Sequence, residues 1–454
     1  MTTINNSPLK PHLLTRAVKA AGGFAALVAA LLVTNPAAAQ DRAITLDEAV
    51  KLGLENSKTL KLSQSKIDQA VSQFEQAKDQ ALPTGKASFG YNRAQIPANK
   101  LTFGEESINL PTSANAWLGT VSLNQTIWAG NKLRYAREST NLLTQVARLD
   151  AVNDRDQIAY NVISAYYNLY KVLQAKKVVE QNLATVDAQI KQSQRFFDQG
   201  LVTKNDVLRF QLQRSNIELN GIDLENNRRI INYNMDILLG LPETEQLTIA
   251  QINDANTEAA PLANYIDTAL AHRAELKQMD LRTQVAETNI KSIKANASPT
   301  LSASGSAYYV GVAANPIPKS GNFITPISLG LTLGWNFGTL WTNKNKVTEA
   351  RLQREEVVIN KGIYTDNIKN EVNQNYQAYK TAIDKINLLQ TSINQANENN
   401  RILESKYKSN ISSATDRADA QTLLYQAQIN LELAKADAGL AYYTLLKSTG
   451  TLNK

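Results

Sequence analysis

Two long stretches of the chain carry apolar residues at alternating steps of four and three, which is the spacing of a coiled-coil helix. They are residues 112–241 and 327–454, and neither contains proline, which breaks a helix by removing a backbone hydrogen bond. Residues 131–199 also lack glycine, so a single helix there would be on the order of 100 Å long at 1.5 Å per residue. Polar Ser193 fills one position of the first pattern, and its apolar positions are Val179, Leu183, Val186, Ile190 and Phe197.

The second stretch repeats this pattern 210 residues later, which indicates an internal duplication. Asn400 is its polar break, and the apolar positions are Leu389, Ile393, Ala396, Leu403 and Tyr407. The repetition includes features that are not helical. Leu82-Pro83-Thr84 and Ser298-Pro299-Thr300 each end a helical segment, and after each the pattern changes to a period of two.

Four segments with this period of two predict β-strands at about 86–96, 117–128, 300–310 and 327–338. In the fourth, small polar residues alternate with Ile327, Leu329, Leu331, Leu333, Trp335 and Phe337. Each strand has about the length that crosses a bilayer when tilted, with one side for lipid and one for water. Tryptophans near the strand ends are candidates for interfacial girdles, although aromatic residues also end strands in soluble sheets: Trp117, Trp128, Trp335 and Trp341.

The remaining segments divide the chain into two repeats. Residues 1–39 combine basic residues, a short apolar run and an Ala-Ala-Ala end, which predicts a cleaved secretory signal peptide. The first repeat is residues 40–240, with a helix, two strands and a helical hairpin with its tip near residue 200. The second is residues 263–454, with the same elements and its tip near residue 410. Residues 241–262 predict an irregular linker, and residues 97–111 and 314–326 predict surface loops.

Four strands per chain are too few to close a barrel, so the pattern predicts an oligomer. An open sheet edge in lipid leaves backbone groups unpaired at several kcal/mol each. Two copies would give 8 strands, which side chains just fill, whereas three copies give 12 strands and room for a lumen. The small polar side of the strands favours the open lumen, and therefore a homotrimer.

Composition excludes several other classes of protein. The chain has no cysteine, so it has neither a lipid-modified N-terminus nor a disulfide framework. Its net charge of +7 falls to about +4 once the three basic residues of the signal peptide are removed, which argues against nucleic-acid binding. The histidines, His12 and His272, do not form a metal motif. We find no phosphate-binding glycine loop or serine-elbow motif, so we expect no cofactor, no metal and no enzymatic activity.

The two turns between the long helices have matching residues. Gly200 and Asn410 are the residue types that most readily adopt the left-handed conformation that ends a helix. Thr203 and Ser413 are suited to cap the returning helices. We therefore expect each turn to reverse the chain into an antiparallel hairpin.

With these turns, spanning residues 195–208 and 407–419, and four amphipathic strands, the sequence resembles the TolC family of outer-membrane efflux ducts over essentially all of residues 40–454. The resemblance implies a mostly α fold with a small membrane β-barrel. In the family, a trimeric 12-stranded barrel with four strands per chain continues into a long periplasmic α-helical barrel. The chain would be localised in the outer membrane of a Gram-negative cell, in contact with its lipid, and project into the periplasm.

The resemblance also implies a function and partners. The chain would be a passive exit duct of a tripartite efflux pump or a type I secretion system. A periplasmic adaptor (membrane fusion protein) and an inner-membrane pump would be its partners. The alternative is a periplasmic coiled-coil adaptor or scaffold, which shares long helical hairpins but has no need of four strands of bilayer length.

Family positions at the tips carry over residue by residue. Asp206, Tyr407, Asp416 and Asp419 match aperture and gating positions, and in a trimer Asp416 and Asp419 would form a ring of six carboxylates that attracts cations. The alternative is that these two acids only favour the positive end of a helix dipole. The implied adaptor contacts are Gly200, Leu201, Thr203, Asn410, Ile411 and Ser413. Ser412 stands where well-known members have an arginine that pairs with aperture residues, so the resemblance does not carry over a closed-state network.

Overall fold

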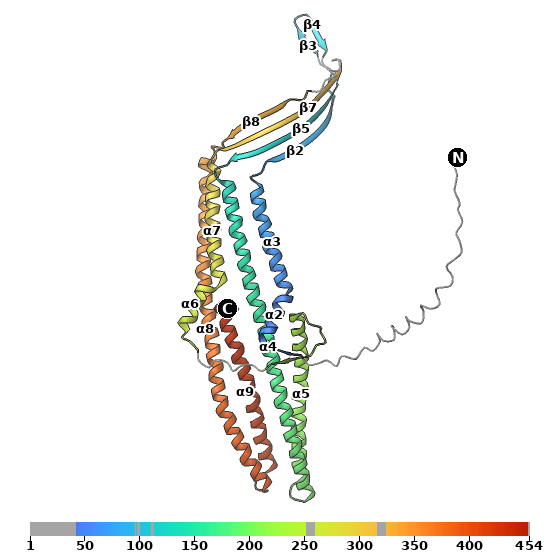
Figure 1. Cartoon of the computed structure of the whole chain (residues 1–454), viewed down its shortest axis with the longest axis vertical. Coiled ribbons are helices and arrows are strands. Elements are labelled where there is room, and N and C mark those ends of the chain that lie inside the picture. Colours follow the sequence, from blue (N-terminus) through green and yellow to red (C-terminus); the bar gives the residue numbers. More distant parts are fainter. Residues whose placement is uncertain are drawn as a thin grey trace, which may run out of the picture.

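The chain forms a curved sheet at one end and a column of long helices below it (Figure 1). The computed structural model describes residues 42–95, 97, 100–109, 113–250, 259–315 and 324–452. The expected signal peptide, residues 1–39, lies outside the described residues.

Matching helices come in the same order in the two repeats. The first repeat has α2 (Leu46–Asn56), α3 (Lys58–Asp79), α4 (Lys132–Asp198) and α5 (Lys204–Leu239). The second has α6 (Leu262–His272), α7 (Ala274–Lys294), α8 (Thr339–Lys408) and α9 (Ala414–Ser448), with a 3-10 turn, η1 (Ala295–Ala297), after α7. Helix α4 has 67 residues and α8 has 70, so the long proline-free stretches do form single continuous helices.

The four long strands form one antiparallel sheet between the helices and the far end of the molecule (Figure 1). They are β2 (Thr84–Gln95), β5 (Ser113–Trp128), β7 (Thr300–Asn315) and β8 (Ile327–Gly334), in the order β2-β5-β7-β8. The strands begin and end up to five residues away from the segments that the alternation predicts. Strands β2 and β8 are the two edges of the sheet, and neither edge has a partner strand among the described residues.

Two segments expected to be irregular contain strands. Within residues 97–111, β3 (Lys100–Phe103) and β4 (Glu106–Asn109) form a short hairpin. Within the linker, β6 (Leu247–Ile249) pairs in parallel with β1 (Arg42–Ile44). Residues 100–109 are exposed, as expected of a surface loop, but neither pair of strands was predicted, because strands of three or four residues are too short to show a period. The second expected loop, residues 314–326, lies mostly outside the described residues.

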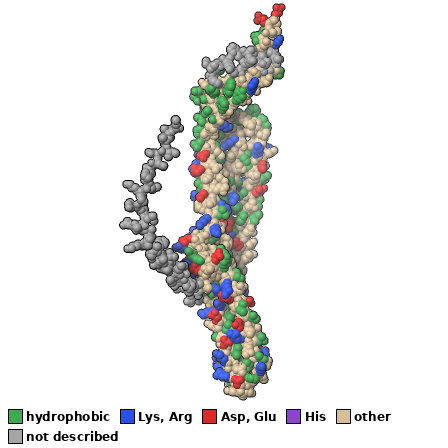
Figure 2. All heavy atoms as spheres, turned by 90° about the vertical axis from the view of Figure 1, so that its right-hand side faces the viewer, with side chains coloured by type: hydrophobic (Ala, Val, Ile, Leu, Met, Phe, Trp, Pro, Cys, Tyr) green, Lys and Arg blue, Asp and Glu red, His purple; other side chains and the backbone are tan. Residues whose placement is uncertain are grey.

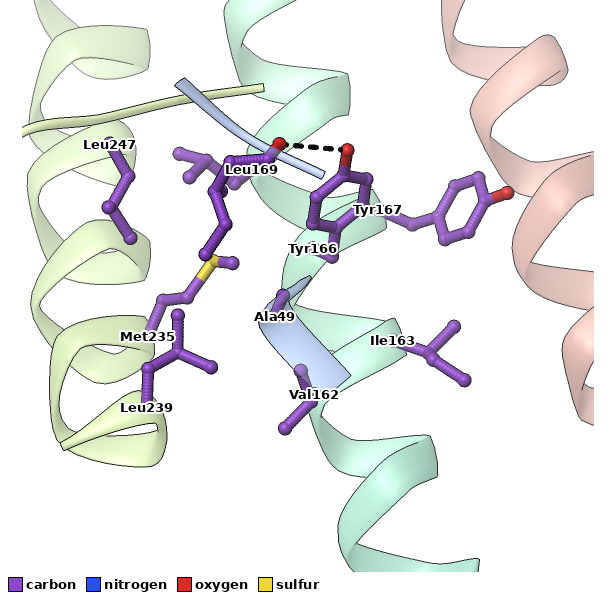
Figure 3. Close-up of a cluster of buried hydrophobic side chains, with 10 residues drawn as sticks. Ala49, Val162, Ile163, Tyr166, Tyr167, Leu169, Met235, Leu239 and Leu247 are labelled. Atoms are coloured by element: carbon purple, nitrogen blue, oxygen red, sulfur yellow. Dashed lines mark hydrogen bonds between the residues drawn. The ribbon is translucent and has the colours of Figure 1, made fainter. Parts of the chain in front are cut away.

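The linker strand is held in place by a buried core at mid-height of the helices. Leu247 on β6 is buried with Leu169, Met235 and Leu239 on one side of α4 (Figure 3). Fully burying an apolar side chain of this size contributes about 1.5–3 kcal/mol. The Tyr166 hydroxyl donates a 3.2 Å hydrogen bond to the carbonyl of Ile44, so the same core also fixes β1 (Figure 3).

Candidate functional site

The turn between α4 and α5 ends one helix and starts the next with backbone hydrogen bonds. Gly200 has φ +70°, the left-handed conformation expected for a helix end. The amide of Gly200 donates to the carbonyl of Phe197 at 2.9 Å, and the amide of Leu201 donates to the carbonyl of Phe196 at 2.8 Å. Thr203 then precedes α5 as its N-cap. Leu201 is left at the outermost point of the turn, with its side chain exposed.

The turn between α8 and α9 has the same construction. Asn410 has φ +59°, and the amide of Ile411 donates to the carbonyl of Lys406 at 2.8 Å. Asparagine can hold this conformation because its short polar side chain tolerates the left-handed region. Ser413 is the N-cap of α9, and its hydroxyl accepts a 3.1 Å hydrogen bond from the amide of Asp416. The sequence therefore predicted the conformation of both tips.

Two of the acidic residues expected at the aperture take part in these caps. The Asp206 carboxylate accepts hydrogen bonds from the amide and the hydroxyl of Thr203, both at 2.8 Å. Asp416 accepts in the same way from the amide of Ser413 at 3.2 Å and from its hydroxyl at 2.8 Å. Asp419, one turn further along α9, is exposed and caps nothing. Asp206 and Asp416 therefore have a local capping role, which agrees with the alternative reading for Asp416 but does not extend to Asp419, and an aperture role would be additional.

Tyr407 joins the two tips through a buried aromatic cluster. Its side chain is 2% exposed, and its ring centroid lies 5.8 Å from those of Phe196 and Phe210. Burial raises the pKa of the Tyr407 phenol. The heptad pattern predicted that Phe197 faces this seam, which is wrong: Phe197 is 39% exposed and Phe196 fills the position. The buried positions that precede it on α4 are Val186, Gln189 and Ser193, a step of three followed by a step of four. The next step of three reaches Phe196, one residue before the position that the heptad pattern predicts.

Arg417 is a buried charge at the second tip that sequence reasoning missed. Its guanidinium contacts the Asn400 side chain and lies 3.7 Å from a Glu404 oxygen, so it connects α9 to α8. Burial lowers the pKa of Arg417, and the charge of Glu404 opposes this. The internal duplication could have revealed this residue. Val207, 210 residues earlier, is a buried apolar residue, so an arginine at the matching position is expected to be buried and to need a partner.

The sheet has one apolar face and one polar face. Directly paired residues lie on the same face, and one row across the strands is Ala87, Val121, Ala307 and Ile327. The adjacent row, which faces the other way, is Lys86, Ser122, Ser306 and Ser328. Figure 2 shows hydrophobic side chains gathered at the level of the sheet, with charged side chains spread over the helices below.

The four tryptophans lie at the two ends of the apolar face. Trp117 lies toward the end away from the helices, and its ring centroid is 5.4 Å from that of Tyr91 with the two rings tilted by 40°. Trp128, Trp335 and Trp341 lie where the strands meet the helices, and the indole of Trp335 donates to the carbonyl of Ala297 at 3.0 Å. A strand tilted by about 45° and rising about 3.3 Å per residue would carry Trp117 about 25 Å above Trp128. That height matches the apolar band of an outer-membrane protein.

Two other features bear on function. Among the described residues, His, Asp and Glu side chains nowhere gather in threes that could hold a metal ion. The His272 ring contacts the carbonyl of Thr268 within its own helix at 3.0 Å. In the part of the chain that the structure describes, no helix combines the length and apolarity needed to cross a membrane.

Comparison with known proteins gives one consistent result. The model of the outer membrane efflux protein family matches residues 49–241 and 265–451. The outer membrane efflux protein BepC of Brucella suis is 23% identical over 443 residues, covering 96% of this chain and 91% of BepC. Two similar solved structures are the outer membrane protein VceC of Vibrio cholerae and the CmeC outer membrane channel of Campylobacter jejuni. Each is 17% identical with a TM-score of 0.69; the matches cover 89% of this chain and 96% of VceC, and 90% of this chain and 86% of CmeC.

Proposed function

The chain belongs to the outer membrane efflux protein family, and from that premise we propose that three copies form one passive exit duct between the periplasm and the cell exterior. The protein is an outer-membrane efflux channel, in a family of channel proteins. We propose in addition its trimeric state, its partner proteins and the roles of its tip residues. Export through such a duct needs no catalytic residue in this chain, because a pump in the inner membrane would supply the energy.

The two faces and the two edges of the sheet are the main support for the trimer. The apolar face of the sheet suits lipid and its small polar face suits water, but the edges β2 and β8 are not paired with any other described strand. An edge exposed to lipid costs several kcal/mol for each unpaired group. Pairing β8 of one copy with β2 of the next removes every edge once the ring closes, and three copies give the 12 strands that leave a lumen.

The helices offer a second surface for the neighbouring copies. Helix α5 carries large apolar side chains at coiled-coil spacing that its own chain leaves exposed. A contiguous apolar stripe of this kind usually marks a protein interface. In the duct it would pack against a long helix of the next copy. The stripe is Leu208, Leu212, Leu219, Ile222, Ile230, Tyr233 and Ile237.

The tips are the proposed docking site for a periplasmic adaptor. Leu201 and Ile411 are 51% and 74% exposed at the ends of the two hairpins, where neither contributes to the aromatic cluster. We expect Leu201→Asp with Ile411→Asp to abolish co-purification of the cognate adaptor while the trimer still forms. The control is Leu219→Asp, in the α5 stripe, which should instead impair assembly. Unchanged co-purification by the tip variant would remove the tips from the adaptor interface.

The acidic residues of the second tip are the proposed selectivity element. In the trimer, Asp416 and Asp419 would place six carboxylates around the periplasmic end, and such a ring favours cations. We expect the purified trimer to conduct in planar bilayers, and Asp416→Ala with Asp419→Ala to reduce its preference for cations over anions. Asp416 also caps α9, so replacing it removes both a charge and a helix cap. Asp419→Ala alone removes only a charge and should give about half the loss of cation preference. Asp198→Ala, an exposed acid at the end of α4, is the control. Selectivity equal to wild type in both variants would refute the ring.

A further inference from the structure

The polar face of the sheet turns apolar near the end of the strands furthest from the helices. Close to the helices this face carries serine, threonine and asparagine, as in the row Thr84, Asn124 and Ser304. Further out, Gly90 pairs with Leu118, Leu118 with Val310, and Val310 with Ile324. The next row brings Val312 to the same face beside Ala116.

Among the described residues, nothing covers Leu118, Val312 or Ile324, and Val310 is half-buried. Leu118 is 47% exposed, Val312 56% and Ile324 65%. A neighbouring copy would not cover Leu118 and Val310 either, because β5 and β7 are the two central strands of the sheet and the copies meet at its edges. In the proposed trimer the side chains therefore face the lumen, at the level where Tyr91 and Trp117 face lipid on the other side.

We propose that Leu118, Val310, Val312 and Ile324 form an apolar collar around the outer end of the lumen, where it binds amphipathic organic solutes as they leave. This inference rests on the proposed trimeric duct, which makes four side chains per copy into one ring. The collar is distinct from the tips, which lie at the opposite end of the molecule (Figure 1).

The width of the lumen decides what such a collar does. Twelve strands about 4.8 Å apart and tilted by about 45° close into a ring about 26 Å across, or about 15 Å between side chains. Hydrophobic gates exclude water only at narrow constrictions. A passage of about 15 Å holds several water molecules abreast, so the collar stays wet and passes ions.

The collar acts instead on solutes that carry apolar surface of their own. A solute that buries about 60 Å² against it gains roughly tenfold in local concentration at about 25 cal/mol per Å². The gain is reversible, so the solute is retained briefly and then released. The rows nearer the helices carry small polar side chains, except that Tyr308 lies beside Thr120 in the row next to the collar.

The test is the block of single-channel current by rhodamine 6G, a cationic amphipathic dye, added from the exterior side of trimers in planar bilayers. We expect the dye to interrupt the current of the wild type, and Leu118→Ser, Val310→Ser and Ile324→Ser together to shorten the blocked intervals about tenfold. Conductance without dye should stay within twofold of wild type. The milder variant Leu118→Thr should shorten the intervals less.

The control variant changes the same lumen at another level. Ser122→Ala, Ser306→Ala and Ser328→Ala replace three side chains of a polar row and should leave the blocked intervals unchanged. If wild type and collar variants conduct and are blocked equally long, the collar is refuted while the duct stands. If the wild type does not conduct at all, the duct is refuted and the collar with it.

Discussion

Asp236 is a buried acid whose charge opposes folding. Its side chain lies on α5 beneath the linker strand, where one carboxylate oxygen accepts a 2.8 Å hydrogen bond from Asn232 and the other finds no hydrogen-bond partner among the described residues. Burial, with a smaller contribution from the charge of Glu245, raises the pKa of Asp236 to about 6. Asn232 also accepts from the amide of Leu247 at 2.8 Å, so the acid lies at the joint between linker and helix.

This position predicts a pH dependence of stability. An unfolded aspartate has a pKa of about 3.9, so between about pH 4 and 6 the folded state binds more protons than the unfolded state. The contribution of Asp236 therefore falls as pH rises through this window, by up to about 3 kcal/mol, and stays constant above it. We expect Asp236→Asn to stabilise the protein relative to wild type at pH 7.5 but not at pH 4, measured by urea unfolding. Asp223→Asn, an exposed acid on the same helix, should show no such difference. If the difference in stability between wild type and Asp236→Asn does not change with pH, this prediction is contradicted.

Single residues were predictable where local backbone geometry decides. Gly200 and Asn410 were predictable as helix ends because few residue types tolerate positive φ. Phe197 was placed wrongly because two adjacent phenylalanines fit the heptad nearly equally, and only packing against Tyr407 selects Phe196. Arg417 was missed because its partners Asn400 and Glu404 lie on a different helix.

At the scale of elements, Glu404 on α8 pairs with Lys408 at 2.7 Å and also lies 3.7 Å from the buried Arg417 on α9, for which it is the countercharge. Removing Glu404 leaves a buried cation without its countercharge, which is more costly than the pair itself is favourable. Glu404 is itself partly exposed, which reduces the loss to about 1–2 kcal/mol. We expect Glu404→Ala to lower the unfolding temperature and to increase the frequency of open events in planar bilayers, because the second hairpin is held less firmly.

The same helix supplies a matched comparison. Glu398 pairs with Arg401 at 2.7 Å, but both side chains are exposed, so Glu398→Ala should leave the unfolding temperature and the frequency of open events close to those of wild type. If the two alanine variants behave alike, Arg417 does not need Glu404, and its contact with Asn400 together with the aromatic cluster is enough to hold the hairpin.

Elements were predictable from the sequence in proportion to their length. Helices α4 and α8 are long enough for the absence of proline to map them, and β8 alternates over its whole length. Strand β6 could not be predicted because a period of two cannot be recognised in three residues. Its position depends on contacts with Asn232 and Leu169, which belong to other elements.

At the scale of the whole molecule, the chain is incomplete by itself. In the part of the chain that the structure describes, the sheet lacks partner strands at β2 and β8, and α5 exposes an apolar stripe along most of its length. The sequence predicted this incompleteness, because four strands of bilayer length cannot close alone. It did not predict the apolar collar, because an alternating strand shows which residues share a face but not which rows align between strands.

The most direct test of the account is a cross-link between the two free edges of the sheet. The chain has no cysteine, so Lys86→Cys on β2 combined with Ser328→Cys, Gly330→Cys or Thr332→Cys on β8 gives a clean background. Within one chain these edges are three strand spacings apart, about 14 Å, which is beyond direct disulfide formation. After oxidation in intact outer membranes, at least one pair should give a covalent ladder that ends at three chains. Monomer alone for every pair, in protein that is present in the outer membrane, would contradict the shared barrel.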